Sequence, residues 1–335
     1  MLKLLDHRTQ VHVDVKRNTR LDELPLGNCS SPLILVAARY ASIKTRKIPA
    51  FVRLLRERLR EHNAPRGFKI GAIHLSDETC DDDTTFYSAV DFVFRNYWCA
   101  PNVKQFDNSR VHYFPLGITK GFAPHWMTNN SSNSSNSSNN NNNNSSSDNS
   151  NNSNNTNTSN GNNNNNSNNP VVMSNKLRLA SERPVLCSFV GDTQDKPRRI
   201  KMIKVLKRNR AKLNCLTRVT DGFYSGLTGE QFAELLDSTA FTLCPKGINE
   251  DQFRIWEALE SGSIPIAEFG PSFLPLPEDN QIPLLHEWRE LIQFMKPFQK
   301  SKAKLDEKQK QVLAWYKQYK RRIQELFKFE SDNHS

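Results

Sequence analysis

The chain has 335 residues, 36% of them hydrophobic, so its length and composition allow two globular domains with a core in each. Its formal net charge of +11 favours partners that carry phosphate, but zinc-finger spacing and an aromatic RNA-binding motif are both missing, so nucleic acid is not the expected partner. The sequence has no run of about 18 apolar residues, so we expect no membrane-spanning helix in it.

The six cysteines include no Cys-x-x-Cys pair, which gives no support to a zinc site. They are Cys29, Cys80, Cys99, Cys187, Cys215 and Cys244. The thiols could pair as disulfides, but their spacing does not assign the pairs. An Asn-Cys-Ser glycosylation sequon begins at Asn28, and it matters only if the chain enters the secretory pathway.

The first third of the chain contains three predicted elements. Residues 32–38 form an apolar run that suits a buried strand, and residues 68–75 form a second one. Between them, residues 48–61 have the apolar spacing of a helix, whose arginine-rich side predicts a solvated face.

Two carboxylates, Asp77 and Glu78, follow the second predicted strand. Ligands of open parallel sheets bind beyond the carboxyl ends of the strands, so either carboxylate could take a proton from an acceptor hydroxyl. The alternative is an acidic surface turn, which the neighbouring run of Asp81, Asp82 and Asp83 favours.

Residues 129–169 are almost wholly Asn and Ser. Such a segment has too few apolar groups to offset its ordering entropy, so we expect it to be disordered. We assign it no chemistry, because a surface loop tolerates a long insertion.

The next predicted strand, residues 185–190, ends at Gly191 and leads to a basic helix over residues 200–209. Arg198 and Arg199 precede this helix and make its N-terminus a candidate phosphate site. By itself this motif is weak evidence for a phosphate site, because arginines at a helix N-terminus are usually only exposed to solvent.

Residues 238–266 read as strand, loop, helix, turn and strand, which predicts a parallel βαβ unit. Gly247 suits the loop, and Asn249 suits a helix N-cap paired with Gln252. The helix is expected to end at Gly262, where a left-handed turn costs least.

One side of this predicted helix is polar. Glu250, Arg254, Glu257 and Ser261 lie on it at about 100° per residue, and Lys246 lies in the loop before it. The helix N-terminus with Lys246 favours an anion such as a diphosphate. By periodicity alone, a solvated charge ladder is the better interpretation.

Further helices are predicted over residues 228–236, with Thr228 as N-cap, and over residues 288–295 and 305–327. The last has an apolar side that either packs on the chain itself or forms a short coiled coil. About two heptads are too few to favour the coiled coil.

Four motifs lie in order along the chain: HLSDE at 74–78, FRNYW at 94–98, FPLG at 114–117 and CPKGINEDQFRIWEALESGSIPIAE at 244–268. Together they resemble the exostosin-like glycosyltransferases, and more narrowly the ribitol xylosyltransferase family. The resemblance reverses the preference for a charge ladder, because it implies that Arg254 and Glu257 are donor-site residues.

The resemblance implies an α/β fold of the GT-B type, with two Rossmann-like domains facing across a cleft. Residues 1–128 would be the acceptor domain and residues 170–290 the nucleotide-sugar domain, with the Asn/Ser insertion at 129–169 between them. The helices of residues 291–335 would brace the two lobes.

The implied activity is an inverting transfer of a sugar, xylose among the candidates, from a UDP-sugar to a hydroxyl of a glycan or polyol phosphate. Asp77 or Glu78 would be the catalytic base. The implied donor-site residues are Gly191, Arg198, Arg199, Lys246, Gly247, Arg254 and Glu257, with the cations stabilising the departing UDP. The implied acceptor contacts are Arg95, Tyr97 and Trp98, although packing in the core is the commoner use of the two aromatic residues.

The resemblance implies no required cofactor and no divalent metal at the Asp81–Asp83 run. The implied partners are a nucleotide-sugar donor and a glycan or glycoprotein acceptor. It also implies a lumenal Golgi protein, held at the membrane only through an anchor that is absent from this sequence.

Two other classes of function compete with the enzyme. One is a catalytically inactive relative that binds glycans or assists a transferase, and the other is a basic protein that binds nucleic acid. The presence of both HLSDE and the Arg254 and Glu257 pair argues against an inactive relative.

Overall fold

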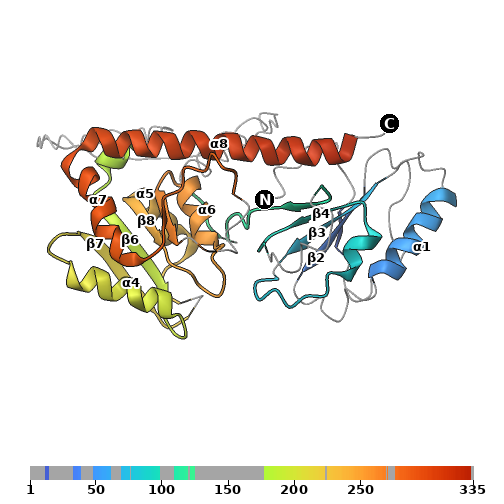
Figure 1. Cartoon of the computed structure of the whole chain (residues 1–335), viewed down its shortest axis with the longest axis horizontal. Coiled ribbons are helices and arrows are strands. Elements are labelled where there is room, and N and C mark those ends of the chain that lie inside the picture. The colour runs from blue at the N-terminus through green and yellow to red at the C-terminus, as the bar shows by residue number, and fades with distance from the viewer. Residues whose placement is uncertain are drawn as a thin grey trace, which may run out of the picture. The chain divides into compact units, whose positions relative to one another are not determined.

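The computed structural model describes residues 12–14, 33–38, 48–61, 69–75, 77–98, 109–119, 121–124, 177–222, 225–268, 270 and 276–332 (Figure 1). The strands in these ranges form two five-stranded sheets in which every pairing is parallel. The predicted α/β class is therefore confirmed. The Asn/Ser tract at 129–169 lies outside the described residues.

The first sheet has its strands in chain order, β1-β2-β3-β4-β5. They are β1 His12–Asp14, β2 Leu33–Ala38, β3 Ile70–Leu75, β4 Phe92–Arg95 and β5 Val111–Tyr113. The helix α1, Ile48–Glu61, lies between β2 and β3 in the sequence, as predicted, and the short 3-10 helix η5, Thr85–Ala89, precedes β4. β3 and β4 are buried along almost their whole length, which explains their nearly unbroken apolar sequences.

The second sheet has the order β10-β9-β8-β6-β7. Its strands are β6 Val185–Asp192, β7 Cys215–Thr220, β8 Thr239–Cys244, β9 Ile264–Glu268 and β10 Leu284–Leu285. The chain runs from β6 to β7 on one side and then places β8 on the other side of β6. The strand order therefore reverses between β6 and β8.

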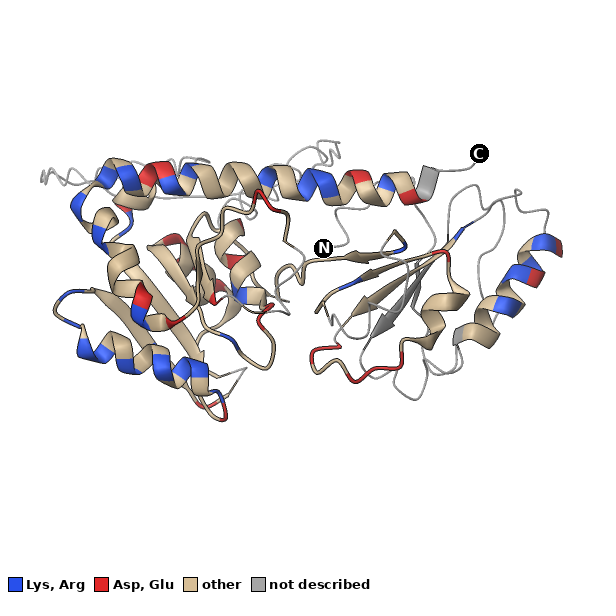
Figure 2. Cartoon of the chain, viewed as in Figure 1, with Lys and Arg blue, Asp and Glu red and all other residues tan. Residues whose placement is uncertain are grey.

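Three helices connect the strands of the second sheet: α4 Pro197–Arg208, α5 Gly229–Asp237 and α6 Phe253–Glu260. α4 begins three residues before its predicted start, because Pro197 suits the first turn of a helix. Thr228 caps α5 as predicted, and its side chain accepts a hydrogen bond from Gln231 N. Lys and Arg recur along α4 and along the C-terminal helix, so positive charge is not confined to one site (Figure 2).

The predicted βαβ unit is confirmed by the parallel pairing of β8 with β9, and Gly262 ends α6 with a φ of 71°. The predicted start of α6 at Asn249 is wrong, because the helix begins at Phe253 after an uncapped Gln252. The two side chains expected to cap the helix close the preceding loop instead. Asn249 Oδ1 accepts from Asp251 N at 3.1 Å, and Gln252 Nε2 donates to Pro245 O at 2.6 Å.

The chain continues through η8, Trp288–Glu290, and α7, Leu291–Lys300, to the long helix α8, Lys302–Asp332. In α8, Phe327 stacks on Phe94 of the first sheet with ring centroids 3.7 Å apart. Closer to its start, Tyr319 stacks on Trp256 of α6 at 5.9 Å. α8 therefore packs against residues of both halves of the chain, while an arrangement of two lobes across a cleft stays a prediction.

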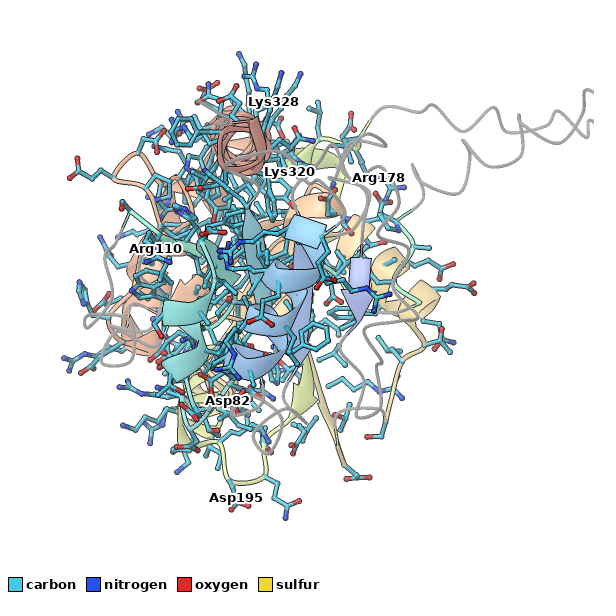
Figure 3. The ribbon with its side chains drawn as sticks, turned by 90° about the vertical axis from the view of Figure 1, so that its right-hand side faces the viewer. Asp82, Arg110, Arg178, Asp195, Lys320 and Lys328 are labelled. Atoms are coloured by element: carbon cyan, nitrogen blue, oxygen red, sulfur yellow. A yellow bond between two sulfur atoms is a disulfide. The ribbon has the colours of Figure 1, made fainter. Side chains whose placement is uncertain are left out.

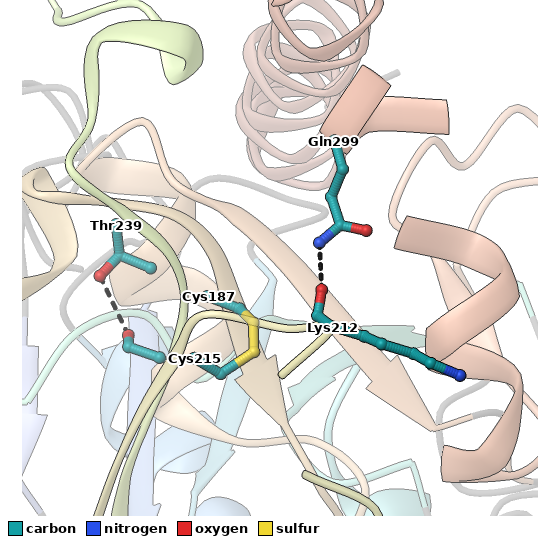
Figure 4. Close-up of a disulfide and its surroundings, with 6 residues drawn as sticks. Cys187, Lys212, Cys215, Thr239 and Gln299 are labelled. Carbon is teal, nitrogen blue, oxygen red and sulfur yellow. Dashed lines mark hydrogen bonds between the residues drawn. A yellow bond between two sulfur atoms is a disulfide. The ribbon is translucent and has the colours of Figure 1, made fainter. Parts of the chain in front are cut away.

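Cys187 of β6 and Cys215 of β7 face each other and form a disulfide (Figure 4). Their Cα atoms are 4.5 Å apart, within the range that a disulfide requires. Cys80 is also disulfide-bonded, and Cys244 is a buried thiol. None of the described helices is both long enough and apolar enough to span a bilayer.

Candidate functional site

The candidate site lies at the carboxyl ends of β6 and β8, where the strand order of the second sheet reverses. Open α/β sheets bind their ligands at this kind of position. Arg199 from α4 and Arg254 from α6 reach the end of β6 there. The structure therefore brings together two arginines that lie far apart in the sequence.

Both guanidinium groups are held by neutral oxygens. Arg254 Nη2 donates to Val190 O at 2.7 Å, and Arg199 Nη1 donates to Asp192 O at 2.7 Å. They lie over the same ring, that of Phe189, at 4.9 Å for Arg254 and 6.0 Å for Arg199. Within the described parts of the chain, neither arginine forms a salt bridge with a carboxylate.

The positive charges of the two arginines repel each other. Burial, followed by the positive charge of Arg254, lowers the pKa of Arg199 to about 10. Burial also lowers the pKa of Arg254. The Nε of each guanidinium is buried without a hydrogen-bond partner in the described chain. An anion with several oxygens would satisfy these donors and cancel the repulsion.

Two glycines let the arginines lie against the backbone. A Cβ at Gly191 would stand 2.8 Å from Arg254 Nη2, and a Cβ at Gly247 would stand 2.9 Å from Arg199 Nη2. Any larger residue would therefore displace a guanidinium. Both glycines were predicted as donor-site residues, and their contacts give them a physical role.

The other two predicted donor-site cations already have carboxylate partners. Lys246 Nζ contacts Glu250 Oε1 at 2.7 Å, and Arg198 Nη1 lies 3.4 Å from Glu268 Oε1. Glu268 Oε2 also accepts from Lys246 N at 2.9 Å. Glu268 was not among the residues predicted from the sequence, although its place at the end of β9 was an available signal.

Glu257 binds a segment of the first half of the chain, and its predicted role at the donor stays a prediction. Its Oε1 accepts hydrogen bonds from Thr119 N at 3.1 Å and from Thr119 Oγ1 at 2.5 Å, so it anchors the segment that follows β5. Burial raises its pKa. Glu250, Glu257 and Ser261 are all buried, so the alternative of a solvated charge ladder on α6 is wrong.

Asp77 and Arg95 form a buried ion pair, with 2.7 Å between Arg95 Nη2 and Asp77 Oδ2. Arg95 was predicted to contact the acceptor, but it has no exposed surface and its guanidinium binds Asp77. Asp77 is 2% exposed, which corrects the alternative of an acidic surface turn at this position. Tyr97 is buried in the apolar core, whereas Trp98 is partly exposed.

Glu78 faces the second sheet. Its backbone oxygen accepts from Asn249 Nδ2 at 3.3 Å. Its negative charge opposes the lowering of the Arg199 pKa that burial and Arg254 cause. Of the two predicted bases, Glu78 is therefore the one whose backbone is bonded to the loop before α6.

Ligand atoms of His74, Asp77 and Asp82 lie within 4.8 Å of one another, the spacing of a metal site (Asp82 is labelled in Figure 3). However, His74 Nε2 contacts Asp82 Oδ2 at 2.9 Å, and Asp77 pairs with the positive charge of Arg95. These atoms already serve as hydrogen-bond partners, so we assign no metal to this cluster.

Residues 166–329 match the family model described as the RXYLT1 C-terminal domain. The C-terminal half of the chain is thus similar to this family. The matched RXYLT1 range contains Gly191, Arg199, Gly247 and Arg254 but leaves out the turn that carries Glu78.

Three curated relatives are each named ribitol-5-phosphate xylosyltransferase 1. The Danio rerio protein is 27% identical over 174 residues, which cover 47% of this chain and 40% of the relative. The Homo sapiens and Mus musculus proteins are 32% and 31% identical over 102 residues, 30% of this chain and 23% of each relative. The chain thus matches less than half the length of these relatives.

Among solved structures, that of Anabaena Alr3699/HepE in complex with UDP is similar to this chain with a TM-score of 0.40. The similarity covers 85% of this chain and 74% of the other chain, at 11% identity.

Proposed function

We propose that the chain is a glycosyltransferase that binds a UDP-sugar at Arg199 and Arg254. The observation that carries this proposal is a pair of neighbouring guanidiniums, at the reversal of strand order, that form no carboxylate salt bridge within the described chain. A diphosphate offers the negative charge and the acceptor oxygens that such a pair lacks. The name of the relatives supports xylose as the sugar and a polyol phosphate as the acceptor.

The proposed architecture is GT-B, in which the first sheet would bind the acceptor and the second the donor. The boundaries near residues 128 and 170 would separate the two lobes. The contacts of α8 with Phe94 and Trp256 support a bracing role for the helices of residues 291–335.

In the proposed mechanism, Glu78 takes the proton of the acceptor hydroxyl as that oxygen attacks the anomeric carbon of the sugar. The bond between this carbon and the UDP oxygen breaks, and its electron pair leaves with the diphosphate. Attack from the side opposite to UDP inverts the configuration. Arg199 and Arg254, with Arg198 and Lys246 as further predicted cations, stabilise the developing charge, and this assignment requires no metal.

Glu78 is preferred to Asp77 as the base because of their surroundings. Asp77 is buried and paired with Arg95, so it would have to break an ion pair to accept a proton. Glu78 is partly exposed, and its backbone O accepts from Asn249 in the loop that also contains Gly247. These surroundings support Glu78 as the base, because a partly exposed carboxylate is accessible to an acceptor hydroxyl.

The test combines UDP-dependent thermal stabilisation with a panel of UDP-sugars assayed for transfer and hydrolysis. We expect UDP to stabilise the parent and the Glu78→Gln variant, and transfer to be lost in Glu78→Gln. Arg254→Gln should lose the stabilisation by UDP, while Arg208→Gln, an exposed arginine on α4, should behave as the parent.

A parent that neither turns over a donor nor gains stability from UDP would refute the proposal. UDP binding without turnover of any donor would instead indicate the alternative, a catalytically inactive relative.

We also propose residence in the lumen of the Golgi. The Cys187–Cys215 disulfide supports an oxidising compartment, because such bonds are rare in the cytosol. Mass mapping of non-reduced peptides from the native protein would test it, and a free thiol at both positions would contradict it.

A further inference from the structure

The turn Asp77–Cys80, which carries Glu78, is restrained by its own backbone. It directly follows the end of β3, and Cys80 N donates to Asp77 O at 3.3 Å, which closes a four-residue turn. Cys80 has a φ of 63°, a conformation that is costly for a residue with a Cβ. Cys80 is also held by a disulfide. Such over-determined backbone is concentrated at functional sites.

A closed ring of hydrogen bonds holds the same turn from inside the first sheet. Its members are Asp77, Arg95, Tyr87, His74 and Asp82. Arg95 donates to Asp77 Oδ2 at 2.7 Å and to the Tyr87 hydroxyl at 3.1 Å. His74 links the Tyr87 hydroxyl, at 2.7 Å, to Asp82 Oδ2, at 2.9 Å. The backbone N of Asp82 returns to Asp77 Oδ1 at 3.1 Å and closes the ring.

One assignment of donors and acceptors satisfies every hydrogen bond of the ring. Because the Tyr87 hydroxyl accepts from Arg95, its own hydrogen can be donated to His74 Nδ1. His74 is then the tautomer with a proton on Nε2, which donates to Asp82. Burial raises the pKa of Tyr87, which keeps this hydroxyl protonated. Loss of one member leaves buried polar atoms unpaired, so the ring acts as a unit.

Asn249 holds the turn from the side of the second sheet. It is 4% exposed, and its Nδ2 donates to Glu78 O. Its Oδ1 accepts from Asp251 N, and its backbone O accepts from Gly247 N at 3.2 Å. A single residue thus connects the turn that carries the proposed base to the loop beside Arg199.

We infer that the ring and Asn249 form a preorganised mount for Glu78, and that Arg95, Tyr87 and Asn249 are positioning residues of the reaction. This inference rests on the proposed function. A displacement of about 1 Å in a reacting group can cost about 100-fold in rate, so restraint of the base is a direct contribution to turnover. It also explains the buried polar groups of the first sheet, which the proposed mechanism does not otherwise use.

The experiment compares two variants with two matched controls. Tyr87→Phe opens the ring by removing one hydroxyl, and Asn249→Asp removes the amide donor to Glu78 while keeping the acceptor for Asp251. The control Tyr316→Phe removes another buried hydroxyl that donates to a carboxylate, that of Glu260. The control Asn280→Asp changes another asparagine that accepts from a backbone N two residues ahead, here Ile282 N.

We expect kcat for transfer to fall by about 10- to 100-fold in Tyr87→Phe and in Asn249→Asp. The KM for the UDP-sugar and the UDP-dependent rise in Tm should stay at the parent values, because the arginine site is intact. Both controls should keep the parent kcat, whatever their Tm.

Three outcomes would overturn the inference. If the parent is active and kcat is unchanged in both variants, turnover does not depend on restraint of Glu78 by the ring and Asn249, and the proposed function then stands. A loss of kcat that follows the loss of Tm in variants and controls alike shows a purely structural ring. If Tyr87→Phe does not fold, Asn249→Asp with the parent kcat is sufficient to refute the mount. A parent without UDP binding or turnover removes the proposed function itself, a result distinct from these three.

Discussion

The substitution Gly191→Ala tests the arginine site with the smallest possible change. The added methyl group would stand 2.8 Å from Arg254 Nη2, closer than real Cβ contacts, so the guanidinium must move. The matched control is Gly222→Ala, because a Cβ there meets no heavy atom within 4 Å. Both variants add the same methyl group, and only one displaces an arginine.

The structure sets the size of the expected effect. Displacement breaks the 2.7 Å bond from Arg254 Nη2 to Val190 O, which orients the guanidinium. A hydrogen bond to a charged group is worth about 1.5–3 kcal/mol. We take the lower limit for the weakened contact with the diphosphate, which corresponds to about a tenfold rise in the Kd for UDP.

Thermal unfolding with and without UDP measures this loss. At a UDP concentration about 100 times the parent Kd, binding stabilises the parent by about 2.7 kcal/mol and a tenfold weaker variant by about 1.4 kcal/mol. The UDP-dependent rise in Tm should therefore be about halved in Gly191→Ala and unchanged in Gly222→Ala. Equal rises in the two variants would show that UDP does not contact Arg254, and the proposed site would be wrong.

Three further predictions concern stability. Burial raises the pKa of Asp251 to about 6, above its ordinary value of 3.8. Between these two pH values the folded state holds a proton that the unfolded chain has released. The free energy of unfolding therefore falls as the pH rises from about 4 to about 6. In Asp251→Asn, the free energy of unfolding measured in urea titrations should depend less on pH between about pH 4 and 6. An unchanged dependence would show that another group causes it. Reduction of the Cys187–Cys215 disulfide, which joins positions 28 residues apart, should cost about 3–4 kcal/mol in chemical denaturation, and no loss of stability would contradict the bond. Phe327→Ala should cost about 3–5 kcal/mol by the same assay, whereas Phe329→Ala, 59% exposed, should cost little; equal losses would contradict the packing of α8 on the first sheet.

Several elements of the fold could be predicted from short stretches of sequence. The helix at 48–61, the cap at Thr228 and the end of α6 at Gly262 each depend on residues within about one helical turn. The start of α6 was predicted by the same local reasoning, and that prediction was wrong. Asn249 and Gln252 have the composition of a cap, but a loop that offered other hydrogen-bond partners took both side chains.

For the candidate site, too, some features could be predicted from the sequence and others required the fold. The family resemblance of the sequence motifs led to the prediction of Gly191, Arg199, Gly247 and Arg254 as donor-site residues before any contact was known. Their grouping required the fold, because only the return of the chain across β6 places α4 and α6 at the same sheet edge. The cysteine pairing was likewise undecided until the register of β6 and β7 placed Cys187 opposite Cys215.

The sequence alone determined the α/β class of this protein and the approximate position of most of its helices, because these depend on side chains close together in the chain. Only the tertiary structure decided that Asp77 pairs with Arg95, that the backbone of Glu78 binds Asn249, and that Glu257 binds Thr119. Such choices depend on which charges lose their water and which partners reach them from distant segments. A buried charge takes the partner that the fold brings to it, and no local pattern contains that information.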